Sequence, residues 1–267
     1  MNILIIDTNI VEKKIIELCL KSKFLDKIYT ASQESIENIP NVEYKDLSEL
    51  IWKAKALKID LAIVTDKNLI RQGIADLFKK NLLNILAVNR KWFNLENSRL
   101  VAKQLMEYYS INHPQTIKAP LVFPIVIKTD KPEITKVAKS MKDLIAIKEK
   151  YSQKNTFIEE YLAGDVYYLL SLWDGKNLLK FPLIQELTEV QEDRLELLNT
   201  KLGIMFSEEK ADFIGFITTK IIWSKNDWHV LDFSMRINKK ADINILKSDF
   251  LFILNSAIYQ KLNEMVF

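Results

Sequence analysis

Short apolar runs alternate with amphipathic segments along the first ninety residues. The run 2–6 is apolar, turn residues follow it, and apolar positions then recur at helical spacing from Ile10 to Leu20. The same reading predicts further strands at 27–30, 61–64 and 85–88, with helices at 46–57 and 69–80. Strands that alternate with helices in this way predict a parallel sheet covered on both faces.

The pattern changes after His113-Pro114, which ends a helix predicted at 99–109. The later part alternates short strands with two hairpins, one around Asp174-Gly175 and one around residues 225–227. Its predicted strands are 124–128, 156–162, 166–173, 178–182, 213–223 and 228–233, and its predicted helices are 134–151, 190–201 and about 248–262. We therefore expect an α/β first part with a parallel sheet and an α+β second part.

Composition excludes several classes of protein. The chain has 267 residues, with 38 Lys and Arg against 35 Asp and Glu, so a net charge of +3 gives little reason to expect a nucleic-acid partner. The run 1–6 is too short for a signal peptide, and no uncharged apolar stretch approaches the roughly 18 residues of a membrane span. We expect a cytoplasmic protein with no membrane partner.

The rarer residue types suggest structural roles. Cys19 lies in an apolar run, which favours a packed thiol over a nucleophile, and one cysteine cannot form a disulfide within the chain. His113 and His229 lack metal-ligand spacing, and the five tryptophans are expected in the core or between lobes.

Glycine is scarce, and this excludes the common phosphate loops. The chain has only five glycines, and no two of them are closer than eleven positions. Walker A and Rossmann loops need closely spaced glycines, because backbone N–H groups must approach the phosphate. Neither loop is present.

Three motifs then occur in a characteristic order. An apolar strand ends in Lys128, a strand carrying Glu159-Glu160-Tyr161-Leu162 is followed by Gly164, and a later strand ends in the run 231–236, Leu-Asp-Phe-Ser-Met-Arg. In this order the motifs resemble those of ATP-grasp proteins. More narrowly they resemble the phosphoribosylamine–glycine ligase family, whose members use ATP to join glycine to phosphoribosylamine.

The resemblance covers nearly the whole chain, although that family carries a further carboxy-terminal domain without a counterpart here. It implies a pre-ATP-grasp domain at 1–97 and a two-lobed ATP-grasp domain at 98–267. The small lobe would span about 119–182 and the large lobe about 183–267.

The resemblance also implies an ATP site. The stretch 95–103 is similar to the family's Leu-Glu-Gly-Ser-Lys segment, and it places Arg99 where a phosphate-binding lysine stands. Lys128 would reach the phosphates, and Lys136, in the lid, would approach them. The hinge positions around adenine and ribose would be Glu159, Glu160, Tyr161, Leu162 and Asp165.

At the last motif the resemblance implies magnesium ligation by Asp232 and Ser234, and a catalytic contact of Arg236 with substrate and phosphate. Ser234 offers a hydroxyl where the family has the carbonyl oxygen of asparagine, and Mg²⁺ demands near-octahedral oxygen geometry. Structural interpretations stay open beside these roles. Lys128 could be an exposed lysine at a strand end. Glu159 and Glu160 could be ordinary strand residues, and Asp232 and Arg236 could form a structural ion pair.

Several phosphate-binding and substrate-binding parts of the family pattern are missing. The turn 7–10 begins with Asp7 where the family binds a sugar phosphate, the loop 65–68 and the lid 131–136 lack glycine, and no glycine occurs between Gly175 and Gly203. Two hypotheses follow. The chain is a divergent ATP-dependent ligase of a small carboxylate and an amine, or a catalytically silent relative that binds a nucleotide, a protein partner or a second copy.

Overall fold

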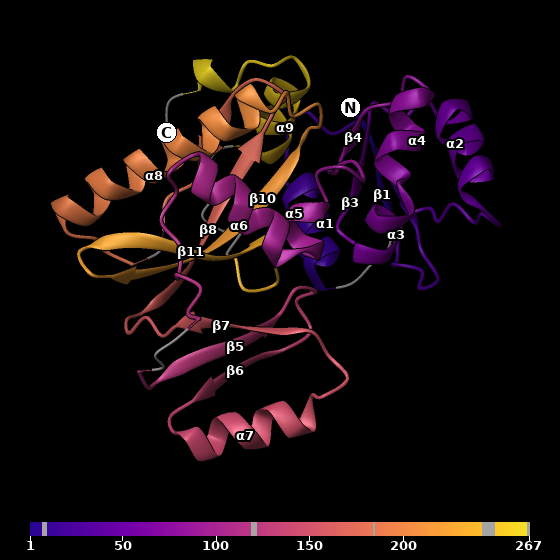
Figure 1. Ribbon diagram of the computed structural model, residues 1–267. Helices are drawn as coiled ribbons and strands as arrows, with labels where there is room; N and C mark the ends of the chain where they lie inside the picture. Colours follow the sequence, from indigo (N-terminus) through magenta and orange to yellow (C-terminus); the bar gives the residue numbers. More distant parts are fainter. Residues whose placement is uncertain (7–9, 119–121, 184, 242–248, 266–267) are drawn as a thin grey trace.

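The computed structural model describes residues 1–6, 10–118, 122–183, 185–241 and 249–265. Its strands form three sheets (Figure 1). Two four-stranded sheets lie side by side, and a three-stranded sheet with one helix projects from them as a separate lobe. None of the helices in the described part combines the length and apolarity needed to cross a bilayer.

The first sheet is parallel, as the alternation of elements predicts. Its strands are β1 (Asn2–Ile6), β2 (Lys27–Ala31), β3 (Leu61–Val64) and β4 (Ile85–Leu86), in the order β2-β1-β3-β4. Ile3 and Ile5 face helix α1 (Ile10–Leu20), which contributes the buried Cys19 to the same apolar cluster. Leu4 and Ile6 point to the other face of the sheet, toward α2 (Leu47–Ala56). Both faces of the sheet are therefore covered, and the packed position predicted for Cys19 is confirmed.

The helix predicted at 69–80 is two helices, α3 (Lys67–Gln72) and α4 (Ile74–Lys80). Gly73 lies between them with φ of 87°, and its N–H bonds to carbonyls of the last turn of α3. A residue in the left-handed conformation ends a helix. The apolar positions keep their helical spacing on both sides of Gly73, so the periodicity alone could not predict this break. Two further helices, α5 (Asn94–Asn97) and α6 (Arg99–Tyr108), lead toward the small lobe.

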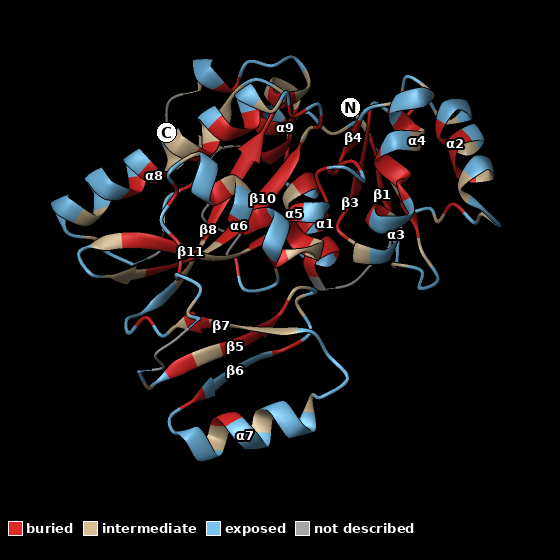
Figure 2. Ribbon diagram, in the orientation of Figure 1, coloured by how far each residue is buried: buried red, intermediate tan, exposed pale blue. Residues whose placement is uncertain are grey.

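The small lobe contains β5 (Ile125–Thr129), β6 (Thr135–Ala138), α7 (Met141–Lys150) and β7 (Thr156–Glu160). The helix predicted at 134–151 is wrong in its first part, because 135–138 pairs with β5 and the helix begins only after its cap, Ser140. The lobe has its own apolar cluster of Ile125, Ile127, Ala138 and Leu144. Most of α7 faces solvent (Figure 2).

The large sheet is antiparallel, in the order β11-β10-β8-β9. Its strands are β8 (Val166–Trp173), β9 (Leu178–Lys180), β10 (Gly215–Ser224) and β11 (Asp227–Ser234). The hairpin of β8 and β9, included in the predicted small lobe of 119–182, pairs with β10 instead. The small-lobe sheet therefore ends at Glu160, and the domain limits stay a prediction.

Helices border this large sheet. Helix α8 (Glu189–Glu208) starts with a capping box of Thr188 and Gln191 and runs past the predicted end at 201. Helix α9 (Phe250–Ile258) and a short 3₁₀ turn, η2 (Leu262–Glu264), follow. Ser248, the predicted start of the last helix, lies outside the described residues.

Strand β11 and the residues after it show how this sheet presents side chains to the small lobe. Phe233, Met235 and Ile237 are buried, whereas Asp232, Ser234 and Arg236 are only partly covered. This alternation puts the three candidate residues on one face. Asp232 contacts Arg99 on α6, whose side chain also bonds to small-lobe carbonyls, so this face looks toward the small lobe.

Candidate nucleotide site between the lobes

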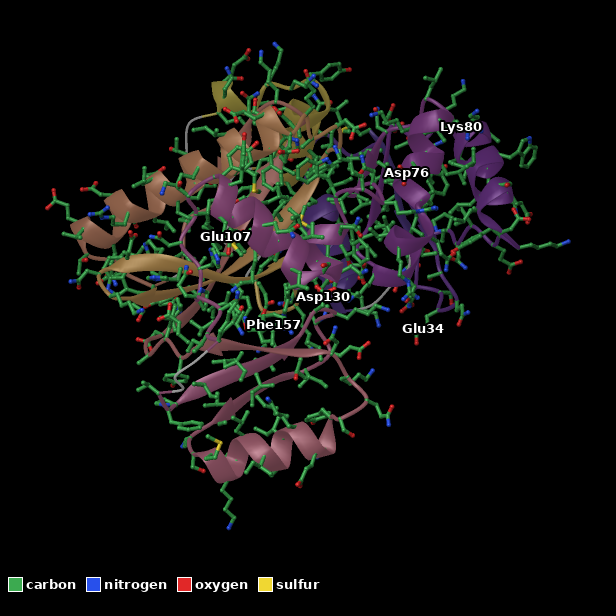
Figure 3. The ribbon with its side chains drawn as sticks, in the orientation of Figure 1. Glu34, Asp76, Lys80, Glu107, Asp130 and Phe157 are labelled. Carbon is green, nitrogen blue, oxygen red and sulfur yellow. The ribbon has the colours of Figure 1, made fainter. Side chains whose placement is uncertain are left out.

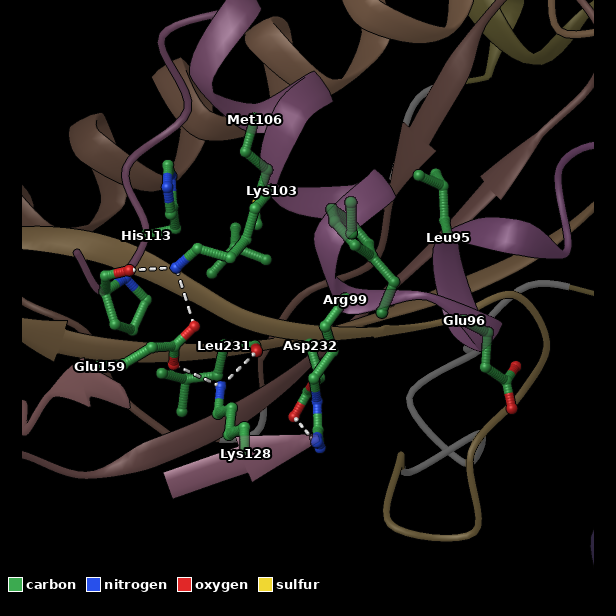
Figure 4. A pocket seen from close by; sticks show the side chains of 14 residues that line it. Leu95, Glu96, Arg99, Lys103, Met106, His113, Lys128, Glu159, Leu231 and Asp232 are labelled. Atoms are coloured by element: carbon green, nitrogen blue, oxygen red, sulfur yellow. Dashed lines mark hydrogen bonds and ion pairs between the residues drawn. The ribbon is translucent and has the colours of Figure 1, made fainter. Parts of the chain in front are cut away.

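Three buried charged side chains meet where the small lobe contacts α6 and β11 (Figure 4). Lys128 Nζ lies 2.8 Å from Glu159 Oε2, and Lys103 Nζ lies 2.8 Å from Glu159 Oε1. The lysines are 4% and 7% exposed, and Glu159 is 2% exposed. We call these three residues the lysine–glutamate triad. Because two cations surround one carboxylate, the triad carries one excess positive charge.

Each lysine of the triad is also tied to a backbone carbonyl. Lys103 Nζ donates to Pro114 O at 2.6 Å, and Lys128 Nζ donates to Leu231 O at 3.2 Å. The contact with Leu231 joins the small lobe to β11. Lys128 is therefore buried, and the alternative that it is an exposed lysine at a strand end is wrong.

Lys103 is a residue that the sequence analysis missed. It lies four positions after Arg99 on α6, so both side chains leave the same face of the helix. A lysine in an amphipathic helix is normally solvated, and two signals could have pointed to Lys103: its spacing from Arg99 and its place at the end of the compared segment 95–103. Its Nζ also lies 6.0 Å from the centre of the Phe157 ring.

Arg99 uses all five of its N–H groups inside the protein. Nε donates a hydrogen bond to Asp232 Oδ1 at 2.7 Å, and Nη2 donates one to Asp232 Oδ2 at 3.4 Å. Nη1 donates to the carbonyls of Thr129 and Ile134, and Nη2 also donates to the hydroxyl of Thr135. A guanidinium has five donors, so in this conformation none is left for a phosphate.

Arg236 pairs with Glu96 rather than with Asp232. Its Nη2 lies 3.0 Å from Glu96 Oε1, and Glu96 also accepts from the backbone N–H of Met235 at 2.9 Å. The structural pair of Asp232 with Arg236 is therefore wrong, since each has another partner. Glu96 is 5% exposed, and its position inside the compared segment 95–103 was the only sequence signal for it.

The predicted magnesium positions fit the ion poorly. Asp232 is neutralised by Arg99, and the Ser234 hydroxyl accepts a hydrogen bond from Asn238 Nδ2 at 3.0 Å. Across the described residues, no group of three or more His, Cys, Asp or Glu could hold a metal. Mg²⁺ is bound by free carboxylates together with phosphates and waters, so these residues do not make a site for it.

The space between these side chains is almost filled. The cavity bounded by the triad, Arg99 and Asp232 has a volume of about 10 Å³. That is close to the minimum for one water molecule, whereas ligand pockets measure roughly 300–1,000 Å³. A nucleotide base can enter only if the small lobe moves.

The remaining predicted site residues lie outside the triad. Lys136 pairs across β5 with Ile127, so it shares the α7 face of the small sheet, opposite to Lys128. The lid role predicted for Lys136 assumed a loop, but 135–138 is a strand. Tyr161 is 42% exposed, Asp165 is exposed and Leu162 is buried.

Glu160 fastens the hinge to neighbouring segments. Its carboxylate pairs with Lys225 in the β10–β11 turn and accepts from the N–H of Gln115 at 3.1 Å. Partial burial opposes ionisation, but the bonds from Lys225 and Gln115 outweigh it and lower the pKa of Glu160.

This shift gives the Glu160 contacts a defined pH dependence. Because the folded pKa is lowered, their stabilisation is complete above the unfolded pKa of about 4.3 and disappears as pH falls through the folded value. The stability difference between the wild type and Glu160→Gln is expected to be constant at neutral pH and to vanish in acid. Urea unfolding across this range measures it, and a difference that grows in acid would contradict the assignment.

The carboxyl edge of the parallel sheet carries an internal acid. Asp7, at the position where the resemblance places a sugar phosphate, lies outside the described residues. Glu12 on α1 accepts from the backbone N–H of Thr65, after β3, at 3.1 Å. The Glu12 carboxylate thus accepts from a backbone N–H at the edge where the resemblance places an anionic sugar phosphate.

Comparisons with known proteins match this architecture. A phosphoribosylamine–glycine ligase of Fusobacterium nucleatum is 24% identical over 99% of this chain and 75% of its own. The crystal structure of phosphoribosylamine–glycine ligase from Thermotoga maritima has a TM-score of 0.74 at 15% identity, covering 100% of this chain and 76% of that chain. D-alanine–D-alanine ligase of Bacillus anthracis, solved with ATP, has a TM-score of 0.64 at 16% identity over the whole of both chains.

No family model matches the sequence. The resemblance that the motifs predict is nevertheless confirmed by the relatives, which align with nearly all of the chain, and by the fold. The chain is thus a relative of the phosphoribosylamine–glycine ligases, and its fold is that of the ATP-grasp ligases.

Proposed function

We propose that this chain is a catalytically silent ATP-grasp protein that binds a purine nucleotide between its two lobes, in the cytoplasm. One observation carries the proposal. Arg99 neutralises Asp232, the expected metal ligand, and spends all five donors within the protein.

Ligation through an acyl phosphate needs cations that are free to neutralise developing phosphate charge. Here Arg99 is held by Asp232, and Arg236 is held by Glu96. Breaking a pair that is largely buried costs several kcal/mol when one partner is left uncompensated, so binding a substrate would first have to offset that cost. This argues against turnover in the original reaction.

Nucleotide binding is compatible with the same contacts. The small lobe has its own apolar cluster, and its contacts with α6 and β11 described above are ion pairs and hydrogen bonds. When the lobe opens, both partners of each broken contact enter water together and neither is left buried without a counter-charge, so opening costs less than removing one partner. In the opened site Lys128 stays paired with Glu159 on the small lobe, and Lys103 on α6 is left with an unpaired positive charge, which favours an anion.

Thermal denaturation with ATP, combined with a phosphate-release assay on mixtures of amines and carboxylates, tests the proposal. We expect ATP to raise the melting temperature, because a ligand that binds only the folded state stabilises it, and we expect no phosphate release. Release above the protein-free rate would establish the ligase instead. Absence of any shift would leave a partner-binding scaffold.

The ligase is the second candidate, and the order of Lys128, the hinge acids and Arg236 along the chain favours it. For this activity a carboxylate, an amine and Mg-ATP would be the substrates. Arg99→Lys, which places the family's residue at this position, offers a direct comparison. A variant that releases phosphate while the wild type does not would identify the Arg99 contacts as the block.

A further inference from the structure

Three side chains form a row across the large sheet. Lys220 on β10 lies directly opposite Asp232 on β11 and directly opposite Tyr168 on β8. Residues directly opposite in antiparallel strands point to the same face. The row Tyr168, Lys220, Asp232 therefore lies on the face that looks toward the small lobe.

A second lysine joins the row. Lys240 Nζ lies 5.5 Å from the centre of the Tyr168 ring. Among the described residues, neither Lys220 nor Lys240 has an ion-pair partner, whereas the charge of Asp232 is cancelled by Arg99. Within the part of the chain that the structure describes, the face thus carries two ammonium groups without a counter-charge. We call Lys220 and Lys240 the lysine pair.

The lysine pair lies on the same face as Asp232 and Ser234, the predicted magnesium ligands, which do not make a suitable site for that ion. A divalent cation beside Asp232 would meet the Arg99 guanidinium, and the ammonium of Lys220 opposite would repel it. The same positions suit an anion, because each ammonium offers three N–H donors to phosphate oxygens.

We propose that the lysine pair replaces the divalent cation, so that this protein holds the phosphate groups of its ligand without metal. The inference deepens the proposed function and rests on it, since the phosphates are taken to be those of the nucleotide between the lobes. Lys220 and Lys240 are positioned to contact them, and no chemical step is implied.

Calorimetric titration with ATP in excess EDTA, repeated in excess Mg²⁺, tests the inference. We expect binding in EDTA at least as tight as in Mg²⁺, since the metal competes with the lysines for the phosphate oxygens. Binding that requires Mg²⁺ would overturn the inference and leave the proposed function intact.

Variants of the lysine pair supply the second arm. Lys220→Gln and Lys240→Gln are each expected to weaken ATP binding in EDTA by about tenfold, the loss of one charge-assisted hydrogen bond. Lys80→Gln, on α4 and far from the small lobe in Figure 3, removes the same charge and is expected to change the affinity by less than about twofold. Equal effects from all three variants would show that only net charge matters.

Inorganic tripolyphosphate in EDTA separates the two proposals if ATP does not bind. Tripolyphosphate has no base, so it does not require the filled cavity at the triad to open. Binding that Lys220→Gln weakens supports the lysine pair even where nucleotide binding fails. No binding of either probe in EDTA would overturn the inference.

Discussion

Glu159→Gln is expected to lower the free energy of unfolding by about 3–5 kcal/mol, the largest effect of any change at the site. The substitution removes the carboxylate that lies 2.8 Å from both Lys103 and Lys128, and it leaves two buried ammonium groups without a counter-charge. Equilibrium unfolding in urea at neutral pH measures the loss.

Two control variants test the cause of this loss. Lys103→Met leaves Glu159 paired with Lys128 as a neutral couple, so it is expected to cost less than Glu159→Gln. Glu264→Gln removes an exposed partner of Lys261 and is expected to change little. If Lys103→Met proved the more damaging of the two triad variants, the excess positive charge would not be the source of the loss.

Gly164→Ala is expected to destabilise the protein by about 3 kcal/mol or more. Gly164 has φ of 149°, a conformation that L-residues rarely adopt, and an added Cβ would overlap the carbonyl oxygen of Trp223 on β10. That atom is backbone and cannot rotate away, so the hinge segment or β10 must shift. Thermal and urea unfolding of the variant measure the effect.

Gly203→Ala is the matched control for Gly164→Ala. Gly203 lies within α8, where an added Cβ would come no closer than 3.7 Å to Leu178 Cβ. Alanine is favoured over glycine in a helix interior by roughly 0.5–1 kcal/mol, so this variant is expected to gain stability. Loss of stability in both variants would indicate a general intolerance of added volume rather than a specific contact at Gly164.

These contacts concern side chains that the apolar interior of the ATP-grasp fold does not depend on. The interior of each sheet depends on apolar periodicity, which this sequence retains. The reaction depends instead on free cations and a free metal ligand. Arg99 and Asp232 satisfy each other, so the fold accommodates both charges without a bound ligand, and the proposed loss of catalysis would leave the fold intact.

The position of Lys136 shows how a site prediction can fail on local structure. The resemblance places Lys136 in a flexible lid, from which its side chain could reach either face of the small-lobe sheet. Pairing of β6 with β5 puts Lys136 on the face of Ile127. A strand fixes the side of each residue, and a difference of one position decides which side that is.

By itself, the sequence determined many of the local elements and the likeness to a family. The buried strand at Asn2–Ile6 and the helix at Ile10–Leu20 follow from spacing among near neighbours, and the scarcity of glycine excludes phosphate loops. Such features depend on residues a few positions apart, so they can be read without knowing how the chain folds back.

Only the tertiary structure decided which charges meet. Arg99 and Asp232 are 133 positions apart, and Lys103 and Glu159 are 56 apart. Their pairing depends on which strands become neighbours, on register and on burial, because a charge removed from water requires a partner close by. That physical requirement closed the predicted nucleotide cleft and placed the lysine pair beside the expected metal ligand.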